Sequence, residues 1–420
     1  MAFTVRGGVL CAEQVSLEDI AGRFGTPCYV YSRAAIEHAY REFTDALAGR
    51  PSLLCYSVKA NSNLAVLALM AKLGAGFDIV SGGELARVAA AGGDPGKVVF
   101  SGVGKSEAEI RNALLAGILS INLESEQELA RVVRVARELG KRAPVAFRVN
   151  PDVDAKTHPY VATGLKESKF GIAYAEAERL YREAVRLPGV RVVGVGFHIG
   201  SLMTDSAPFV AATRRIVALA GELERAGIAL EHIDLGGGMG IRYNDETPAP
   251  IAAFVRGALD ALGARKERIL LDPGRSIVGN AGVLLTRVEY VKPGETKNFV
   301  VVDAAMNDLI RPALYEAWHE VRTVRQPAGE AESRAAARVY DVVGPVCESA
   351  DFIARDRRLA AQSGDLLAVM SAGAYGMAMS SNYNSRPRPA EVLVDGARAH
   401  LVRPRERVEQ LFAGEEVPPL

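Results

Sequence analysis

The chain has 420 residues, of which 49% are apolar and 24% are charged, and its fifty basic residues balance fifty acidic ones. This composition is typical of a soluble globular protein with a large core, and it excludes a disordered or collagen-like chain. The neutral balance argues against a nucleic-acid partner or an anionic membrane surface, and no apolar run approaches the ~18 residues of a membrane span.

The four cysteines, Cys11, Cys28, Cys55 and Cys347, are widely scattered. They form no CxxC pair, and no histidine lies beside them at metal-ligand spacing. We therefore expect no metal site and a reduced, cytoplasmic setting. The N-terminal MAFTVRGGVLCAEQ also lacks the basic start and continuous apolar stretch of a signal peptide.

Between about residues 30 and 277, short β-rich apolar runs alternate with longer segments of helical periodicity. The eight runs begin near residues 53, 77, 97, 118, 143, 190, 232 and 268, and they read LLCYSV, FDIV, KVVF, ILSINL, APVAFRV, VRVVGVGF, HIDL and RILL. Segments between them, such as LAVLALMAKLG and EQELARVVRVARELG, have the apolar spacing of amphipathic helices. This alternation predicts an α/β fold, a closed (β/α)8 barrel of the TIM type. The alternative, an open doubly wound sheet, ordinarily has fewer strands.

After about residue 280 the pattern changes to strand-like runs separated by glycine, proline and polar turns. These runs are GVLLTRVEYV, NFVVVDA, ARVYDVVG, DLLAVM and AEVLVDG, and they predict a mostly β second domain, a sandwich or barrel. The first 29 residues fall outside the barrel pattern, so we expect them to pack with this domain. The expected domains are thus 30–277 and 1–29 plus 278–420, with a flexible excursion at 325–336.

Working residues in such a barrel lie where the strands end. Lys59 follows the first run, where partial desolvation would prepare its amine for a Schiff base. A lysine at a strand end can also simply extend its amine to solvent. His198 closes the sixth run, and it can be either a catalytic residue or a hydrogen-bonded structural one.

The loops after the seventh and eighth runs are where barrels often bind phosphate. Gly236, Gly237 and Gly238 in DLGGGMG would let backbone N–H groups approach a phosphate, or they form only a tight turn. In LLDPGR, Asp272 could face a protonated ring nitrogen while Arg275 binds an anion. A structural salt-linked turn is the alternative for this pair.

Three C-terminal segments complete the pattern: MNDLIRPALYEAWH (306–319), GPVCESADF (344–352) and AGAYGMAMSSNYNSRPRPAEVLV (372–394). With the barrel motifs, they resemble the fold type III pyridoxal-phosphate decarboxylases, and among these the diaminopimelate decarboxylase family, over nearly the whole chain. The resemblance implies pyridoxal 5'-phosphate as cofactor and a carboxy-lyase that converts meso-2,6-diaminopimelate to L-lysine and CO2, the last step of lysine biosynthesis. It also implies a homodimer with shared sites, in which GPVCES reaches the barrel of the partner.

The resemblance further assigns roles to single residues. It implies that Lys59, His198 and Cys347 are catalytic, Cys347 as the proton donor, with Lys59 a second candidate for that proton. The implied cofactor-binding residues are Lys59, His198, Ser201, Gly236, Gly237, Gly238, Asp272, Gly274, Arg275 and Tyr375. The implied substrate-binding residues are Arg275, Arg311 and Tyr315 for the distal carboxylate, Glu348 for the distal ammonium, and Tyr375.

Two positions depart from the family pattern. The usual EPGR is DPGR here, so we expect Asp272 to reach the ring nitrogen less directly or through water. The residue after HIGS is usually Gln and is Leu202 here, so one polar contact near the phosphate is expected to be absent.

Several other functions stay open at this point. An ornithine- or arginine-type decarboxylase would share the fold but would have little use for Arg311 and Tyr315. A racemase is disfavoured because an acidic group near the ring nitrogen strengthens the electron sink. A catalytically inactive binding homologue should have lost Lys59 or Cys347, and both are present. A barrel enzyme acting on sugar phosphates without a cofactor would be colourless.

Overall fold

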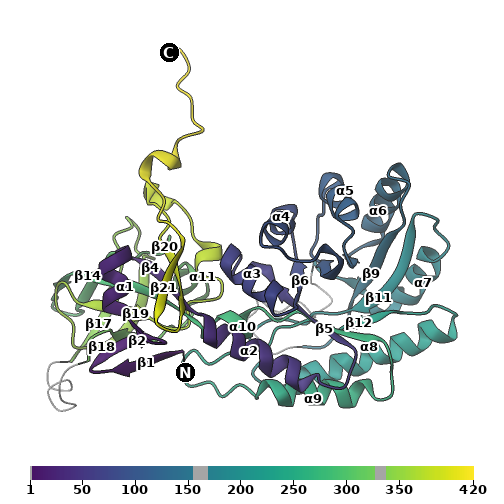
Figure 1. The fold of residues 1–420 in the computed structure, drawn as a ribbon, viewed down its shortest axis with the longest axis horizontal. Coiled ribbons are helices and arrows are strands. Elements are labelled where there is room, and N and C mark those ends of the chain that lie inside the picture. The colour runs from purple at the N-terminus through teal and green to yellow at the C-terminus, as the bar shows by residue number, and fades with distance from the viewer. Residues whose placement is uncertain (1, 155–168, 327–336) are drawn as a thin grey trace. The chain divides into compact units, whose positions relative to one another are not determined.

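The computed structural model describes residues 2–154, 169–326 and 337–420 (Figure 1). It contains two compact units. The barrel unit comprises Ala39–Ile241 and Thr247–Ser276, and the β unit comprises Met1–His38, Arg242–Glu246 and Ile277–Leu420. Of the expected excursion at 325–336, residues 327–336 lie outside the described residues. Within the described part of the chain, no helix has both the length and the apolar character needed to cross a bilayer.

The barrel unit is a closed ring of eight parallel strands, which confirms the predicted fold. Each predicted apolar run supplies one strand, and the last strand pairs with the first. In order around the ring they are β5 (Ser52–Ser57), β6 (Gly76–Ile79), β7 (Val98–Phe100), β8 (Ser120–Leu123), β9 (Ala143–Asn150), β11 (Val190–Gly196), β12 (His232–Asp234) and β13 (Arg268–Leu271). A two-residue strand, β10 (Ile172–Ala173), pairs with the last two residues of β9.

Helices follow the strands of this unit, as Figure 1 shows. They are α3 (Leu64–Lys72), α4 (Gly82–Ala90), α5 (Glu107–Ala116), α6 (Glu126–Glu138), α7 (Tyr174–Ala184), α8 (Ala207–Arg225) and α9 (Ile251–Leu262), while α2 (Arg33–Ala46) and α10 (Arg275–Val278) pass from one unit to the other. Helix α6 illustrates the local cause: the Ser125 side chain accepts a hydrogen bond from the N–H of Glu128 at its start. Leu129, Val132 and Ala136, at helical spacing, are buried.

The β unit contains a small antiparallel sheet and a larger sheet. The small sheet is β1 (Phe3–Arg6), β2 (Val9–Ala12) and β3 (Val15–Ser16), followed by α1 (Leu17–Phe24). The larger sheet has the order β18 (Phe352–Leu359), β17 (Arg338–Val343), β15 (Phe299–Val302), β14 (Gly282–Lys292), β4 (Cys28–Ser32), β20 (Ala390–Asp395) and β21 (Arg398–Arg403). Off this path, β19 (Leu366–Val369) pairs with β14, and β16 (Val321–Thr323) pairs with β19. The five predicted runs form β14, β15, β17, β19 and β20, which confirms the mostly β character of this part of the chain.

One apolar cluster joins the two sheets of the β unit. Leu10 and Leu17 from the N-terminal segment are fully buried, as are Val283 and Val392 from strands β14 and β20. Burying each such side chain contributes about 1.5–3 kcal/mol before entropic costs. This packing holds the start of the chain against strands that lie more than 250 residues later in the numbering.

Candidate active site

Lys59 lies at the barrel mouth, the name used here for the region where the eight parallel strands end. It sits in a short turn, η1 (Val58–Ala60), directly after β5. Its Nζ lies 3.0 Å from Oδ2 of Asp78, a residue of β6 that is almost fully buried. The Lys59 side chain itself is 36% exposed, so a ligand can reach the amine. The buried carboxylate therefore anchors an accessible amine at the barrel mouth.

Three carboxyl groups lie close together beneath this amine: Asp78, Asp234 and Asp272. The Asn122 side chain donates to Asp234 Oδ2 at 3.1 Å, and the Ser57 hydroxyl lies 3.2 Å from Asp78 Oδ2 and 2.9 Å from the Asp272 carbonyl oxygen. Burial, followed by the neighbouring Asp234 and Asp78, raises the pKa of Asp272 well above its ordinary value. Burial likewise raises the pKa of Asp234 to about 6.

Asp272 has an oxygen that the described residues do not satisfy. Its Oδ1 is buried, and no hydrogen-bond partner for it is found among residues 2–154, 169–326 and 337–420. A buried polar atom left in this state costs about 1–3 kcal/mol. A protonated ring nitrogen would supply both a donor and a positive charge at this oxygen, and both stabilise the ionised carboxylate.

His198 follows β11 and contacts the glycine loop after β12. The N–H of Gly237 donates to His198 Nδ1 at 3.4 Å, and Arg148 donates to the His198 carbonyl at 3.3 Å. Burial, followed by the positive charges of Arg148 and Lys59, lowers the pKa of His198 well below its ordinary value. The ring is therefore neutral at physiological pH and can lie against an aromatic ligand without placing a second cation beside Lys59.

The glycine loop passes so close to its neighbours that side chains do not fit. A Cβ at Gly238 would lie 1.9 Å from the carbonyl oxygen of Gly200, and one at Gly236 would lie 2.4 Å from that of Phe197. Gly238 also has a φ of +89°, which L side chains rarely adopt. The loop thus presents bare backbone, the form in which N–H groups can approach an anion.

Arg275 follows β13 and supplies positive charge in the barrel unit. It is 7% exposed, and its Nε and Nη2 lie 3.4 and 3.3 Å from the hydroxyl oxygen of Ser201. Gly274, just before it, packs where a Cβ would lie 2.9 Å from the side chains of Ser57 and Ala60. A guanidinium and a hydroxyl held together in this way can share one phosphate group.

We predict that Gly238→Ala destabilises the protein by roughly 3 kcal/mol or more, because the added methyl collides with a backbone oxygen and the backbone is strained. Gly227→Ala is the matched control: Gly227 has a φ of +78° but nothing within 4 Å of its Cβ position, so only about 1–2 kcal/mol of strain is expected. Urea unfolding of both variants gives the comparison. Equal losses in the free energy of unfolding for the two variants would show that crowding at Gly238 is unimportant.

The remaining predicted residues lie in the β unit. Arg311 and Tyr315 are the two ends of helix α11 (Arg311–Tyr315), and Arg311 is 3% exposed. Its guanidinium lies 2.9 Å from Nε2 of His319 and 4.7 Å from the ring centroid of Tyr243. Tyr375, half-buried with a φ of +56°, lies in the turn region after β19.

Cys347 and Glu348 lie exposed on the loop between β17 and β18. The Cys347 N–H donates to the Asn384 side-chain oxygen at 3.0 Å. Buried Asp351 accepts hydrogen bonds from the N–H groups of Val346 and Met306, both at 2.7 Å. The loop is therefore fixed from both sides although its tip is exposed.

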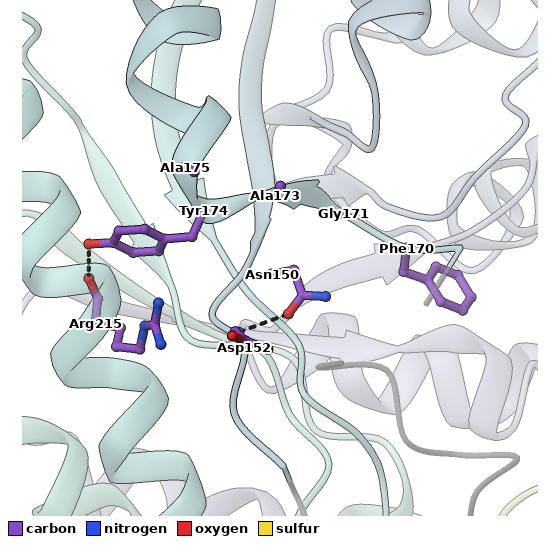
Figure 2. Close-up of a pocket in the computed structure, with 8 residues that line it drawn as sticks. All are labelled: Asn150, Asp152, Phe170, Gly171, Ala173, Tyr174, Ala175 and Arg215. Carbon is purple, nitrogen blue, oxygen red and sulfur yellow. Dashed lines mark hydrogen bonds between the residues drawn. The ribbon is translucent and has the colours of Figure 1, made fainter. Parts of the chain in front are cut away.

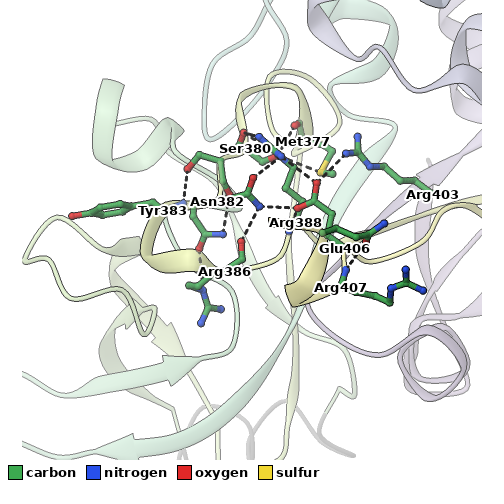
Figure 3. A network of polar contacts seen from close by, with 12 residues as sticks. Met377, Ser380, Asn382, Tyr383, Arg386, Arg388, Arg403, Glu406 and Arg407 are labelled. Carbon is green, nitrogen blue, oxygen red and sulfur yellow. Dashed lines mark hydrogen bonds and ion pairs between the residues drawn. The ribbon is translucent and has the colours of Figure 1, made fainter. Parts of the chain in front are cut away.

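A polar network supports the segment that contacts Cys347 (Figure 3). Glu406 accepts from the Asn382 side chain at 2.7 Å and from the Arg388 backbone N–H at 2.9 Å. Arg388 in turn donates to the Asn382 side-chain oxygen at 2.7 Å. This network fixes residues 382–388, the segment that includes Asn384.

A separate cavity of about 400 Å³ lies beside the end of β9 (Figure 2). It contains none of the predicted site residues; it is lined by Asn150, Asp152, Phe170, Gly171, Ala173, Tyr174, Ala175 and Arg215. The Tyr174 hydroxyl donates to the Arg215 carbonyl at 3.1 Å, and the Arg215 guanidinium lies over the Tyr174 ring. We assign this cavity no role.

The sequence interpretation missed several residues that organise the site: Asp78, Asn122, Arg148, Asp234, Tyr243 and His319. Asp78 carried a readable signal, because a lone acid inside the apolar run FDIV has to find a partner when buried. Tyr243 and His319 carried none, since their contacts with Arg311 depend on how the chain folds and follow no sequence pattern.

The groups at the barrel mouth fit pyridoxal phosphate, which has an aldehyde for the Lys59 amine, a ring nitrogen for Asp272 Oδ1 and a phosphate for the glycine loop. Residues 33–279 match the family described as pyridoxal-dependent decarboxylase, pyridoxal binding domain. The class is therefore that of the pyridoxal-phosphate-dependent decarboxylases built on a (β/α)8 barrel.

Full-length comparisons narrow this class. The chain is 58% identical to diaminopimelate decarboxylase of Pseudomonas aeruginosa, with 99% of each chain covered. The crystal structure of the enzyme from M. jannaschii superposes with a TM-score of 0.93 at 37% identity, covering 100% of this chain and 98% of the other. The Helicobacter pylori enzyme complexed with L-lysine gives 0.90 at 42% identity, covering 95% and 98%. The chain belongs to the diaminopimelate decarboxylase family.

Proposed function

We propose that the protein removes CO2 from meso-2,6-diaminopimelate to give L-lysine, with pyridoxal 5'-phosphate as its cofactor. The observation that carries this proposal is the 58% identity with a diaminopimelate decarboxylase over 99% of both chains. An ornithine-type decarboxylase is less well supported, because the lysine/ornithine decarboxylase from Vibrio vulnificus is only 22% identical and indicates the fold alone.

Residues of the barrel unit would hold the cofactor, which supplies an electron sink for the electrons left when CO2 departs. Lys59 would hold the cofactor through its aldehyde, His198 would lie against the ring, and Asp272 would pair with the ring nitrogen. The backbone N–H groups of the glycine loop Gly236–Gly238 would donate to the phosphate, and Gly274 would leave room for its approach. Ser201 and Arg275 would complete the phosphate site, and Tyr375 is proposed as a further cofactor-binding residue.

The groups that recognise and protonate the substrate would come from the β unit, apart from Arg275, which belongs to the barrel unit. Arg311 and Tyr315, with Arg275, bind the distal carboxylate, and Glu348 pairs with the distal ammonium. The Cys347 thiol delivers a proton to the carbon that has lost CO2, and solvent then restores the thiol. Substrates that lack a distal carboxylate gain nothing from Arg311, so this arrangement favours diaminopimelate.

We further propose a cytoplasmic homodimer in which Cys347 and Glu348 of one chain serve the barrel of the other. The fixed but exposed loop at 344–351 supports this assignment, because its reactive tip is presented outward. The functional domains are then the cofactor-binding barrel at 30–277 and a β domain at 1–29 plus 278–420 that carries substrate and partner-site residues.

The experiment that tests the activity is direct. Carbon dioxide release from meso-diaminopimelate is followed with and without added pyridoxal phosphate, and ornithine and alanine are run in parallel. Of the three substrates, we expect only diaminopimelate to release carbon dioxide. Its release should increase when pyridoxal phosphate is added to enzyme that has been depleted of cofactor. Faster carbon dioxide release from ornithine than from diaminopimelate, or racemisation of alanine, would contradict the proposed function.

We predict that Arg311→Ala raises the KM for meso-diaminopimelate by about 10–100-fold with a smaller change in kcat, because a charge-assisted contact to a carboxylate contributes about 1.5–3 kcal/mol. Arg325→Ala is the control, since Arg325 pairs with Glu18 on the surface and its side chain is 69% exposed. Steady-state kinetics measures both variants. An unaltered KM in Arg311→Ala would contradict the distal-carboxylate role.

A further inference from the structure

Arg311 forms a hydrogen bond with a fully buried histidine, His319. His319 is 0% exposed and both of its ring nitrogens are engaged. Nδ1 lies 2.8 Å from the carbonyl oxygen of Met370, and Nε2 lies 2.9 Å from Nη1 of Arg311. All three residues belong to the β unit.

These two contacts define the protonation state of the ring. A carbonyl oxygen only accepts, so Nδ1 of His319 carries a hydrogen and donates it to Met370. A guanidinium only donates, so Nε2 carries a lone pair and accepts from Arg311. His319 is therefore neutral and in the Nδ1–H tautomer. Protonation of Nε2 would set two N–H donors against each other.

The surrounding contacts fix the ring and the guanidinium together. The Tyr243 ring lies edge-on to the His319 ring, with the two centroids 5.3 Å apart. The Arg311 guanidinium lies over the face of the Tyr243 ring. The His319 carbonyl accepts from Arg357 at 3.2 Å. Arg311 is thus oriented by an acceptor on one nitrogen and by an aromatic face, both of them neutral groups that leave its positive charge in place.

We propose that His319 is a positioning residue for substrate selection: its Nε2 lone pair sets the orientation of the Arg311 guanidinium toward the distal carboxylate. This inference rests on the proposed function, in which Arg311 binds that carboxylate. It goes further by assigning the discrimination between ligands with and without the carboxylate to a residue that does not touch the ligand.

Two substitutions separate this role from a structural one. His319→Gln places an amide oxygen near the Nε2 position, so it keeps an acceptor for Arg311 and loses the contact to Met370. His319→Asn places its amide near Nδ1, so it keeps the donor to Met370 and loses the acceptor for Arg311. Each variant loses one buried hydrogen bond, so their thermal stabilities should be similarly reduced.

The measurement is calorimetric titration of the holoenzyme with L-lysine and with cadaverine, which is lysine without its carboxylate. We expect His319→Asn to weaken lysine binding about tenfold, and His319→Gln to stay within about twofold of the parent chain. Cadaverine should bind both variants as it binds the parent. Equal weakening of lysine by the two variants, or equal weakening of both ligands, would overturn the proposal.

Arg311→Ala distinguishes failure of the inference from failure of the proposed function. If it leaves the preference for lysine over cadaverine unchanged, the role of Arg311 itself is wrong. If it removes that preference while His319→Asn retains it, only the positioning role is wrong. If both the role of Arg311 and the positioning role of His319 are right, adding His319→Asn to Arg311→Ala should weaken lysine binding no further, because the histidine acts through the arginine.

Discussion

Replacing Lys59 with alanine should abolish turnover of meso-diaminopimelate and remove the visible absorbance of the cofactor-loaded enzyme. The amine is the covalent partner of the cofactor in the proposed function, and a methyl group offers no nucleophile in its place. The expected loss is at least 10³-fold in kcat, the scale seen when a covalent catalyst is removed. Absorbance spectra and carbon dioxide release on one preparation measure the two effects together.

Lys59→Ala also leaves the buried carboxylate of Asp78 without its cation, so the variant could lose activity by unfolding. Lys59→Arg separates the two causes. Its guanidinium retains the positive charge beside Asp78 but, being always protonated, does not form the covalent link to the cofactor. We expect this variant to melt close to the parent temperature and still be inactive. Substantial turnover by folded Lys59→Arg would rule out the covalent role.

Replacing Cys347 with alanine should lower kcat by about 10²–10⁴-fold, the usual contribution of a positioned acid, while the cofactor stays bound. Cys347 is the exposed cysteine; Cys11, Cys28 and Cys55 are buried, and burial raises the pKa of Cys28 to about 12. No buried thiol is therefore a substitute donor. Cys347→Ser, a weaker acid of similar shape, should fall between the parent and the alanine variant. Unchanged turnover in Cys347→Ala would reassign the proton to Lys59.

The same two alanine variants test the shared site. If Cys347 serves the partner's barrel, a mixed dimer of Lys59→Ala and Cys347→Ala contains one site with both changes and one site with neither. After exchange of subunits at equal concentrations, about a quarter of all sites should be intact by random pairing in a two-fold dimer. The mixture should regain about that fraction of activity. No recovery after proven exchange would place Cys347 in its own chain's site.

The barrel could be predicted well because its signal is local. Each buried parallel strand is a short apolar run, and each is followed by a helix with its own periodicity, so eight repeats specify the architecture. The β unit was harder to predict. Strand β18, FIARDRRL, and strand β21, RAHLVR, carry so many charges that they resemble surface loops. Their pairing with β17 and β20 depends on partners that periodicity does not reveal.

The candidate site also has a part that the sequence indicates and a part that it does not. Lys59, His198 and Asp272 became candidates because each polar residue closes an apolar run. The contacts that control them were not visible, since the ion pair of Lys59 with Asp78 and the hydrogen bond of His319 to Arg311 depend on three-dimensional proximity. Sequence predicts which groups are available for chemistry, and geometry determines their protonation and direction.

The loop that carries Cys347 is anchored within its own chain, by Asp351 at one side and Asn384 at the other. Two such chains can therefore meet as preformed surfaces, with little ordering entropy to lose on association. Under the proposed dimer, assembly should resemble the docking of rigid bodies, with a heat-capacity change that reflects the area covered and shows no added folding signature.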